Sequence, residues 1–168
     1  MAMSNGKVVN FFTGSLVIDG QNQPSQSLTL KRGVARFDLN VDVAGSATIE
    51  SLTLRNVAQS GYLFAQGEVA ASPADVERND VTAHFDTALS ASTPGVLYVY
   101  EQENAGIEVS IEAVIDGQHK VLTKTLEGNL KRNTIYTVTV RKNDIDIVVK
   151  VGIDDWEPGE DTEIIPQL

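Results

Sequence analysis

The alternation of apolar and polar residues towards the end of the chain predicts a long β-hairpin. Apolar side chains recur at every second position in residues 130–140 and again in residues 144–156: Tyr136, Val138, Val140, then Ile145, Ile147, Val149, Val151 and Ile153. Successive side chains of a strand point to opposite faces, so each run has one core face and one polar face. The polar residues 141–143 join the two runs, and the second run ends at Trp156, the only tryptophan.

Similar patterns predict further strands upstream of this hairpin. They cover residues 7–18, 27–32, 34–43, 47–57, 61–65, 81–86, 96–101, 107–115 and 119–126. Within residues 47–57 the phase slips between Ile49 and Leu52, which a β-bulge near Glu50 and Ser51 explains. Asp116-Gly117 is a two-residue hairpin signal. About eleven strands with regular turn signals predict an all-β fold made of one or two antiparallel β-sandwiches.

The pattern weakens in residues 66–94, which suggests a connection between two halves. Ser72 and Pro73 precede acidic residues, and a Ser N-cap followed by Pro at the first helical position predicts one short helix. We therefore expect four segments: an N-terminal sandwich half over 7–65, the connection over 66–94, a C-terminal half over 95–157 and an acidic and apolar tail over 158–168.

Composition narrows the possible partners. The chain has 168 residues, enough for a substantial core, and a net charge of −10. This charge disfavours nucleic acid and anionic membrane surfaces as partners, because both require basic groups on the protein.

The absence of cysteine excludes thiol catalysis, disulfides and cysteine metal sites. No apolar run is long enough to span a membrane. The start lacks an apolar leader, so the protein is either cytosolic or has had its leader removed.

The sequence offers no recognisable catalytic, cofactor or metal site, and we expect no enzyme. His84 and His119 stand in no nucleophile–base motif, which favours a structural role for both. No glycine-rich phosphate loop is present. The acidic residues near the closing hairpin do not have the spacing of an EF-hand calcium loop: Asp144, Asp146, Asp154 and Asp155.

Aromatic residues leave two interpretations open. Tyr98 and Tyr100 share one face of a predicted strand and, with Tyr62, could form a platform for a sugar. Aromatic pairs on strands more often pack against side chains of neighbouring strands, and we favour that interpretation.

Three short motifs in a fixed order resemble the fimbrillin-type proteins of Bacteroidetes, the subunits of type V pili and their anchor and tip relatives. In residues 28–39 the pattern Leu-x-Arg-x-x-Ala-Arg ends at Arg36. The second motif is a tyrosine–glutamate–asparagine strand that runs from Leu97 to Asn104. In residues 130–138 an Arg-Asn-x-x-Tyr motif begins at Arg132, and its hairpin partner ends at Trp156.

The resemblance implies two transthyretin-like, Greek-key sandwich halves on an exported protein of the cell surface. In that family an Arg-specific protease removes an N-terminal strand, and a C-terminal strand of a neighbouring subunit fills the groove. It thus implies a structural or accessory subunit of a fimbria, associated with the outer membrane, in cell adhesion. The partners would be other pilus subunits or a second copy, added through a β-strand, and a host or bacterial surface protein or glycan.

The tail supplies a candidate donor strand for such assembly. Ile164, Ile165 and Leu168 are apolar and could fill a groove, whereas Pro166 shortens the ladder that the tail could form. The alternative is a frayed acidic tail. The other functional alternative is a surface-exposed module that binds a glycan or a protein without polymerising.

The chain also departs from the family pattern. It is short for a two-domain fimbrillin and lacks the upstream strand, the lipid-attachment cysteine and the protease-site loop. We assign no cleavage site, because Arg32 and Arg36 lie inside predicted strands.

Overall fold

The computed structural model describes residues 2, 7–16, 28–151 and 163–164. The strands in these residues are β1 (Phe12–Thr13), β2 (Leu28–Thr29), β3 (Lys31–Arg32), β4 (Val34–Val41), β5 (Ala47–Ala58), β6 (Arg78–Leu89), β7 (Thr93–Tyr100), β8 (Glu108–Ile115), β9 (Gln118–Thr125), β10 (Thr134–Val140), β11 (Ile145–Val151) and β12 (Glu163–Ile164). None of the described residues forms a helix, so none belongs to a helix that could cross a membrane. The all-β prediction is confirmed.

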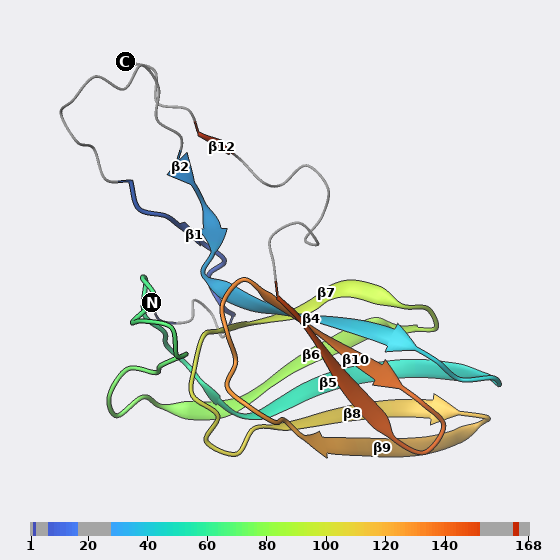
Figure 1. Cartoon of the computed structure of the whole chain (residues 1–168). Helices are drawn as coiled ribbons and strands as arrows, with labels where there is room; N and C mark the ends of the chain where they lie inside the picture. The colour runs from blue at the N-terminus through green and yellow to red at the C-terminus, as the bar shows by residue number, and fades with distance from the viewer. Residues whose placement is uncertain (1, 3–6, 17–27, 152–162, 165–168) are drawn as a thin grey trace.

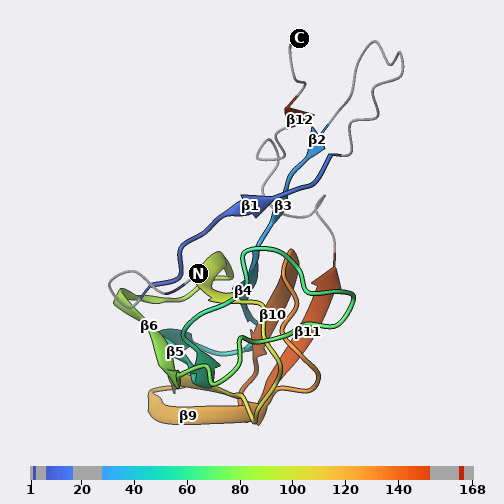
Figure 2. The same cartoon turned by 90° about the vertical axis from the view of Figure 1, so that its left-hand side faces the viewer.

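Eight of these strands form two four-stranded sheets that pack face to face (Figures 1 and 2). The strand orders are β11-β10-β4-β7 and β6-β5-β8-β9. Neighbours are antiparallel except β4 and β10, which run parallel. Strands from both predicted halves therefore share one sandwich, because β4 and β5 each lie inside a sheet completed by later strands. The boundaries predicted for the four segments stay a prediction.

The core follows the predicted alternation. Phe37 of β4 and Tyr136 of β10 stack at its centre, with ring centroids 5.2 Å apart. Val138 and Val140 are buried on the same face of β10 as Tyr136. On β11 burial fades from Ile145, which is buried, to residues near the strand's end, because β11 is the outermost strand of its sheet.

Two local predictions about β5 and the β8–β9 turn are confirmed. The pairing of β5 with both neighbours shifts register between Ile49 and Ser51, where the bulge was expected. Asp116 and Gly117 both have positive φ, 49° and 78°, which the type I′ turn of a two-residue hairpin requires.

The predicted helix in the connection is wrong, and Ser72 shows why. Residues 74–75 form only a turn, with Asp75 in the left-handed region at φ 53°. The Ser72 hydroxyl accepts hydrogen bonds from the Glu103 backbone N–H at 3.0 Å and from Arg78 Nη2 at 3.2 Å. Its oxygen therefore serves a long-range contact instead of an N-cap.

Three predicted strands differ in extent. The strand predicted over 81–86 extends over the whole of β6. Residues 61–65 form no strand, and their backbone is bound by a distant arginine described below. In the described part of the first run, residues 7–16, only Phe12–Thr13 is a strand. Residues 17–27 and Trp156 lie outside the described residues.

The N-terminal segment covers the outer face of the β11-β10-β4-β7 sheet. Val8 and Phe11 pack there against Val34, Tyr100 and Ile135. Gly33 makes this contact possible, because a Cβ at that position would lie 2.1 Å from the Phe11 ring. Beyond this cover, β1 pairs with β3 and β12 pairs with β2, and these short strands extend away from the sandwich (Figure 1).

The central aromatic stack supports a stability prediction. Phe37→Ala should lower the free energy of unfolding by about 3–5 kcal/mol, because it removes a fully buried ring and leaves a cavity. Val148→Ala, at a position that is 55% exposed on β11, is the matched control and should change it by less than about 0.5 kcal/mol. Urea unfolding followed by circular dichroism measures both, and equal effects of the two variants would contradict the assignment of the core.

Candidate functional site

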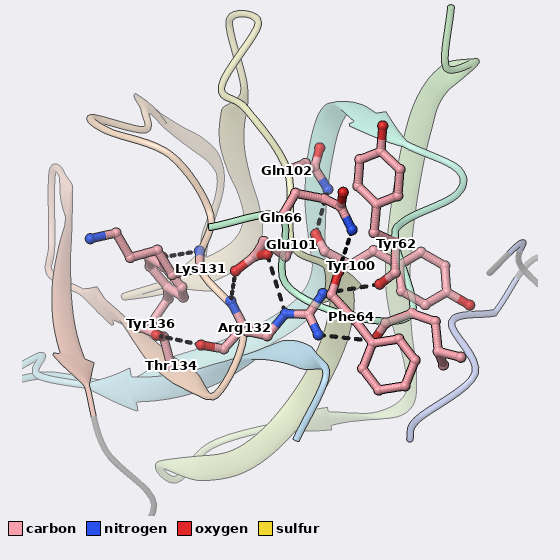
Figure 3. A network of polar contacts seen from close by, with 11 residues as sticks. Tyr62, Phe64, Gln66, Tyr100, Glu101, Gln102, Lys131, Arg132, Thr134 and Tyr136 are labelled. Carbon is pink, nitrogen blue, oxygen red and sulfur yellow. Dashed lines mark hydrogen bonds and ion pairs between the residues drawn. The ribbon is translucent and has the colours of Figure 1, made fainter. Parts of the chain in front are cut away.

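A largely buried ion pair lies at one end of the sandwich (Figure 3). Glu101 follows β7 and Arg132 precedes β10; Arg132 Nε lies 3.2 Å from Glu101 Oε1, and their side chains are only 12% and 11% exposed. The Arg132 backbone N–H also donates to Glu101 Oε2 at 3.1 Å. A buried pair stabilises a fold only when its other donors are satisfied. The remaining guanidinium nitrogens donate to the carbonyls of Leu63 and Tyr62, both at 3.0 Å.

These two contacts hold the base of the loop between β5 and β6, residues 59–77. Gln66 adds a hydrogen bond from its side-chain amide to the Phe64 carbonyl at 3.0 Å. The loop exposes three apolar side chains, of which Phe64 is 55% exposed: Leu63, Phe64 and Val69. We call these three residues the apolar loop tip. The strand predicted over residues 61–65 is this loop instead, and Gly61 and Gly67 bracket the segment as turn signals.

Gln102 connects the two sheets beside this ion pair. Its side chain is fully buried. Its Oε1 accepts from the Ala58 N–H at 2.8 Å and from Arg78 Nη1 at 3.3 Å, and its Nε2 donates to the Tyr100 carbonyl at 2.9 Å. Its backbone exchanges two hydrogen bonds with Leu130, at 2.9 and 3.1 Å. Each polar group of this buried residue therefore has a partner, as buried amides require.

Tyr136 fixes the entry to β10 in the manner of a tyrosine corner, in which a phenol bonds to the backbone just upstream. Its hydroxyl accepts from the Lys131 N–H at 2.9 Å and donates to the Asn129 carbonyl at 3.2 Å. Burial raises the pKa of the Tyr136 phenol; the Lys131 hydrogen bond opposes this rise and the nearby Glu101 charge adds to it.

The tyrosines considered as a sugar platform are placed differently from each other. Tyr100 is fully buried, and its hydroxyl accepts from the Val9 N–H at 2.9 Å and donates to the Ala2 carbonyl at 3.1 Å. Its ring lies under the N-terminal segment, with the Phe11 centroid 6.3 Å away. Tyr98 is half-buried in the same cluster. The Tyr100 ring thus offers no face to a ligand.

The candidate donor residues lie largely outside the described part of the chain. Ile164 belongs to β12, which pairs with Leu28 and Thr29 of β2 and not with either four-stranded sheet. Ile165 and Leu168 lie outside the described residues. A donor role for the tail stays a prediction.

A groove of about 550 Å³ lies between β6 and β7, the strands at one edge of each sheet. Its apolar lining is half-buried and packs against the core, and the N-terminal segment forms part of the wall. The lining includes Val81 and Phe85 of β6, Val96 and Leu97 of β7, and Lys7 and Val8 of the N-terminal segment. This seam between the sheets is therefore incompletely filled by the chain's own side chains. The strands predicted over 81–86 and 96–101 contain its β6 and β7 lining, but the groove arises because β6 and β7 each end a sheet, and no local pattern determines that strand order.

The histidines and the aspartates that were considered as site residues from the sequence lie apart from this groove or at its rim. His84 on β6 lines the groove, whereas His119 is on β9, and β5 and β8 separate these two strands. Asp146 on β11 binds Lys124 Nζ at 2.9 Å, and this hydrogen bond lowers the pKa of the Asp146 carboxyl. Asp154 and Asp155 lie outside the described residues.

Comparisons with known proteins point to a bacterial β-sandwich. The sequence profile of the bacterial Ig-like domain matches residues 66–150. No curated protein matches the sequence. A proposed cell adhesion protein from Parabacteroides distasonis shares the fold, with a TM-score of 0.50 and 20% identity over 82% of this chain. A proposed cell adhesion protein from Bacteroides uniformis is 12% identical over 89% of this chain and 67% of its own length, with a TM-score of 0.48. The chain spans 52% of the length of the Parabacteroides protein.

The buried ion pair supports a second prediction. Arg132→Ala should lower the free energy of unfolding by about 3–5 kcal/mol, because it leaves the Glu101 carboxylate buried without its partner. It should also increase amide hydrogen exchange in residues 61–66, because the carbonyls of Tyr62 and Leu63 lose the donor that holds this segment in place. Arg55→Ala is the control: its ion pairs with Asp80 and Glu108 are exposed and worth at most about 1 kcal/mol. Unchanged exchange of the loop in Arg132→Ala would show that the arginine does not hold it.

Proposed function

Because the chain belongs to the bacterial Ig-like domain family, we propose that it is a β-sandwich module of cell-surface adhesion that joins protein partners by β-strand addition. The adhesion role proposed for the Parabacteroides distasonis protein, which shares the fold, supports this function. In its specific form the proposal is a structural or accessory subunit of a fimbria, located at the outer surface and without catalytic activity.

The observation that carries this proposal is the groove between β6 and β7. Val81 and Phe85 on one side and Val96 and Leu97 on the other present half-buried apolar surface between two strands that end their sheets. An edge strand offers backbone groups for pairing, and an apolar groove beside it offers pockets for alternate side chains. Apolar residues on a strand of a partner would complete the seam.

The proposed occupant is the tail of a second copy. In an extended strand Ile164 and Leu168 would share the face towards the groove and Ile165 would lie on the other face, while the acidic residues before them stay in water. The groove is bounded by Lys7 and Val8, so the N-terminal segment of the receiving copy would move aside to admit the full strand.

A second candidate function rests on the apolar loop tip. Leu63, Phe64 and Val69 are exposed, while the base of their loop is held by Arg132. A preorganised loop with exposed apolar side chains suits binding of a surface protein without polymerisation. The glycan platform is not favoured, because the Tyr100 ring is buried.

Strand addition predicts that deleting residues 162–168 abolishes self-assembly of the chain. Analytical ultracentrifugation of the full chain and the deletion would measure the loss, which should be complete because no other apolar strand is available in the tail. A synthetic peptide of residues 162–168, added to the deleted chain, should shift the methyl resonances of Val81, Val96 and Leu97.

Phe64→Ser is the matched control, because it changes the apolar loop tip and leaves the groove intact. It should assemble like the unmodified chain. Assembly that persists after the tail deletion would contradict strand addition by the tail. Assembly lost in Phe64→Ser but retained in the deletion would also contradict it, because the copies would then associate through the apolar loop tip.

A further inference from the structure

Three potential metal ligands meet on the β6-β5-β8-β9 sheet. They are Glu50 of β5, Glu112 of β8 and His119 of β9, one from each of three consecutive strands. Their ligand atoms all lie within 4.8 Å of one another. Glu50 is half-buried and the other two side chains are exposed, so water and ions can reach the cluster.

The pairing of the strands explains how these residues meet. Ile49 pairs with Ala113 and Ser51 pairs with Glu112, so Glu50 is the extra residue of the β5 bulge. A bulge changes the direction of a side chain relative to the ladder. His119 pairs with Val114, which is two positions from Glu112 and on the same face of β8. Diagonal neighbours of this kind are within reach of long side chains.

The charge around the cluster is unbalanced. Among the described residues, the ion pairs of Glu50 involve only His119, at 3.4 Å from Nε2 to Oε2, and Glu112 has none. Elsewhere on the same sheet Glu108 lies 3.3 Å from Arg55. Two neighbouring carboxylates therefore share one imidazole, and a bound cation would offset their mutual repulsion.

The donor set and its spacing fit a transition metal. An imidazole nitrogen with two carboxylate oxygens is a ligand set of zinc, with bonds of about 2.0–2.2 Å. Tetrahedral geometry then separates the ligand atoms by about 3.4 Å, the separation already present between His119 and Glu50. Calcium, by contrast, takes six to eight oxygen ligands and rarely imidazole.

We propose that Glu50, Glu112 and His119 form a binding site for a divalent transition metal ion of the zinc class. Three protein ligands leave at least one coordination position open to water or to a donor group of a partner. Because the ligands stand on hydrogen-bonded strands, the fold sets their positions before the metal binds. The proposal is independent of strand addition, which uses the opposite edge of the sheet from β9.

Titration of the full chain with Zn²⁺ alone, followed by isothermal calorimetry, tests this site. We expect saturable binding of one ion. His119→Ala and Glu112→Gln should each weaken it by about tenfold or more, because even outer-shell substitutions cost about 10–100-fold in metal affinity. Ca²⁺ should bind more weakly than Zn²⁺. Glu108→Gln is the matched control, since it removes a carboxylate of the same strand that pairs with Arg55, and its affinity should match that of the unmodified chain.

Circular dichroism of each variant without metal establishes that the fold is retained, as expected for substitutions at exposed positions. Absence of saturable Zn²⁺ binding would overturn the proposal. Equal affinity of Glu112→Gln, His119→Ala and the unmodified chain would also overturn it, because the ion would then bind elsewhere and the histidine would serve only as an ion-pair partner of Glu50.

Discussion

The fold depends on the hydrogen bonds that the backbone makes where the chain crosses from one sheet to the other. Between β7 and β8 the peptide groups leave both ladders, and buried groups of this kind need other partners. At Gln102 the backbone exchanges hydrogen bonds with Leu130, and the fully buried side-chain amide bonds to Ala58 of β5 and Tyr100 of β7. The Glu101–Arg132 pair lies beside it, and Arg132 also donates hydrogen bonds to two carbonyls of the β5–β6 loop. The motif residues 100–104 are therefore scaffold.

The sandwich has two different surfaces: the end at the Glu101–Arg132 ion pair and the groove between β6 and β7. At the end that holds Glu101 and Arg132, all three guanidinium nitrogens of Arg132 have acceptors, and the loop that they bind carries the apolar loop tip. The seam between β6 and β7 is incompletely filled, although its lining packs against the same core. A sandwich with one seam of this kind can remain stable as a monomer and still gain buried apolar surface when a strand is added. Stability and assembly would thus rest on different residues.

Local patterns were sufficient for much of the fold. The bulge in β5, the Asp116-Gly117 turn and the β10–β11 hairpin were predictable because each is determined by neighbouring residues. Predictions that depend on distant contacts were less successful. Ser72 has the sequence context of an N-cap, but its hydroxyl accepts hydrogen bonds from Glu103 and Arg78. Residues 61–65 have the pattern of a strand, but Arg132 donates to a carbonyl of this segment. The parallel pairing of β4 with β10 and the meeting of Glu50 with His119 likewise depend on strand order, which no short motif determines.

The central claim is that the β6–β7 groove receives a strand. A cryo-electron microscopy structure of the assembled protein tests it most directly. The account predicts continuous density for an added strand in the groove, hydrogen-bonded to an edge strand and with its apolar side chains against Phe85 and Leu97. Copies that touch only through the apolar loop tip, with the groove as in the single chain, would contradict it.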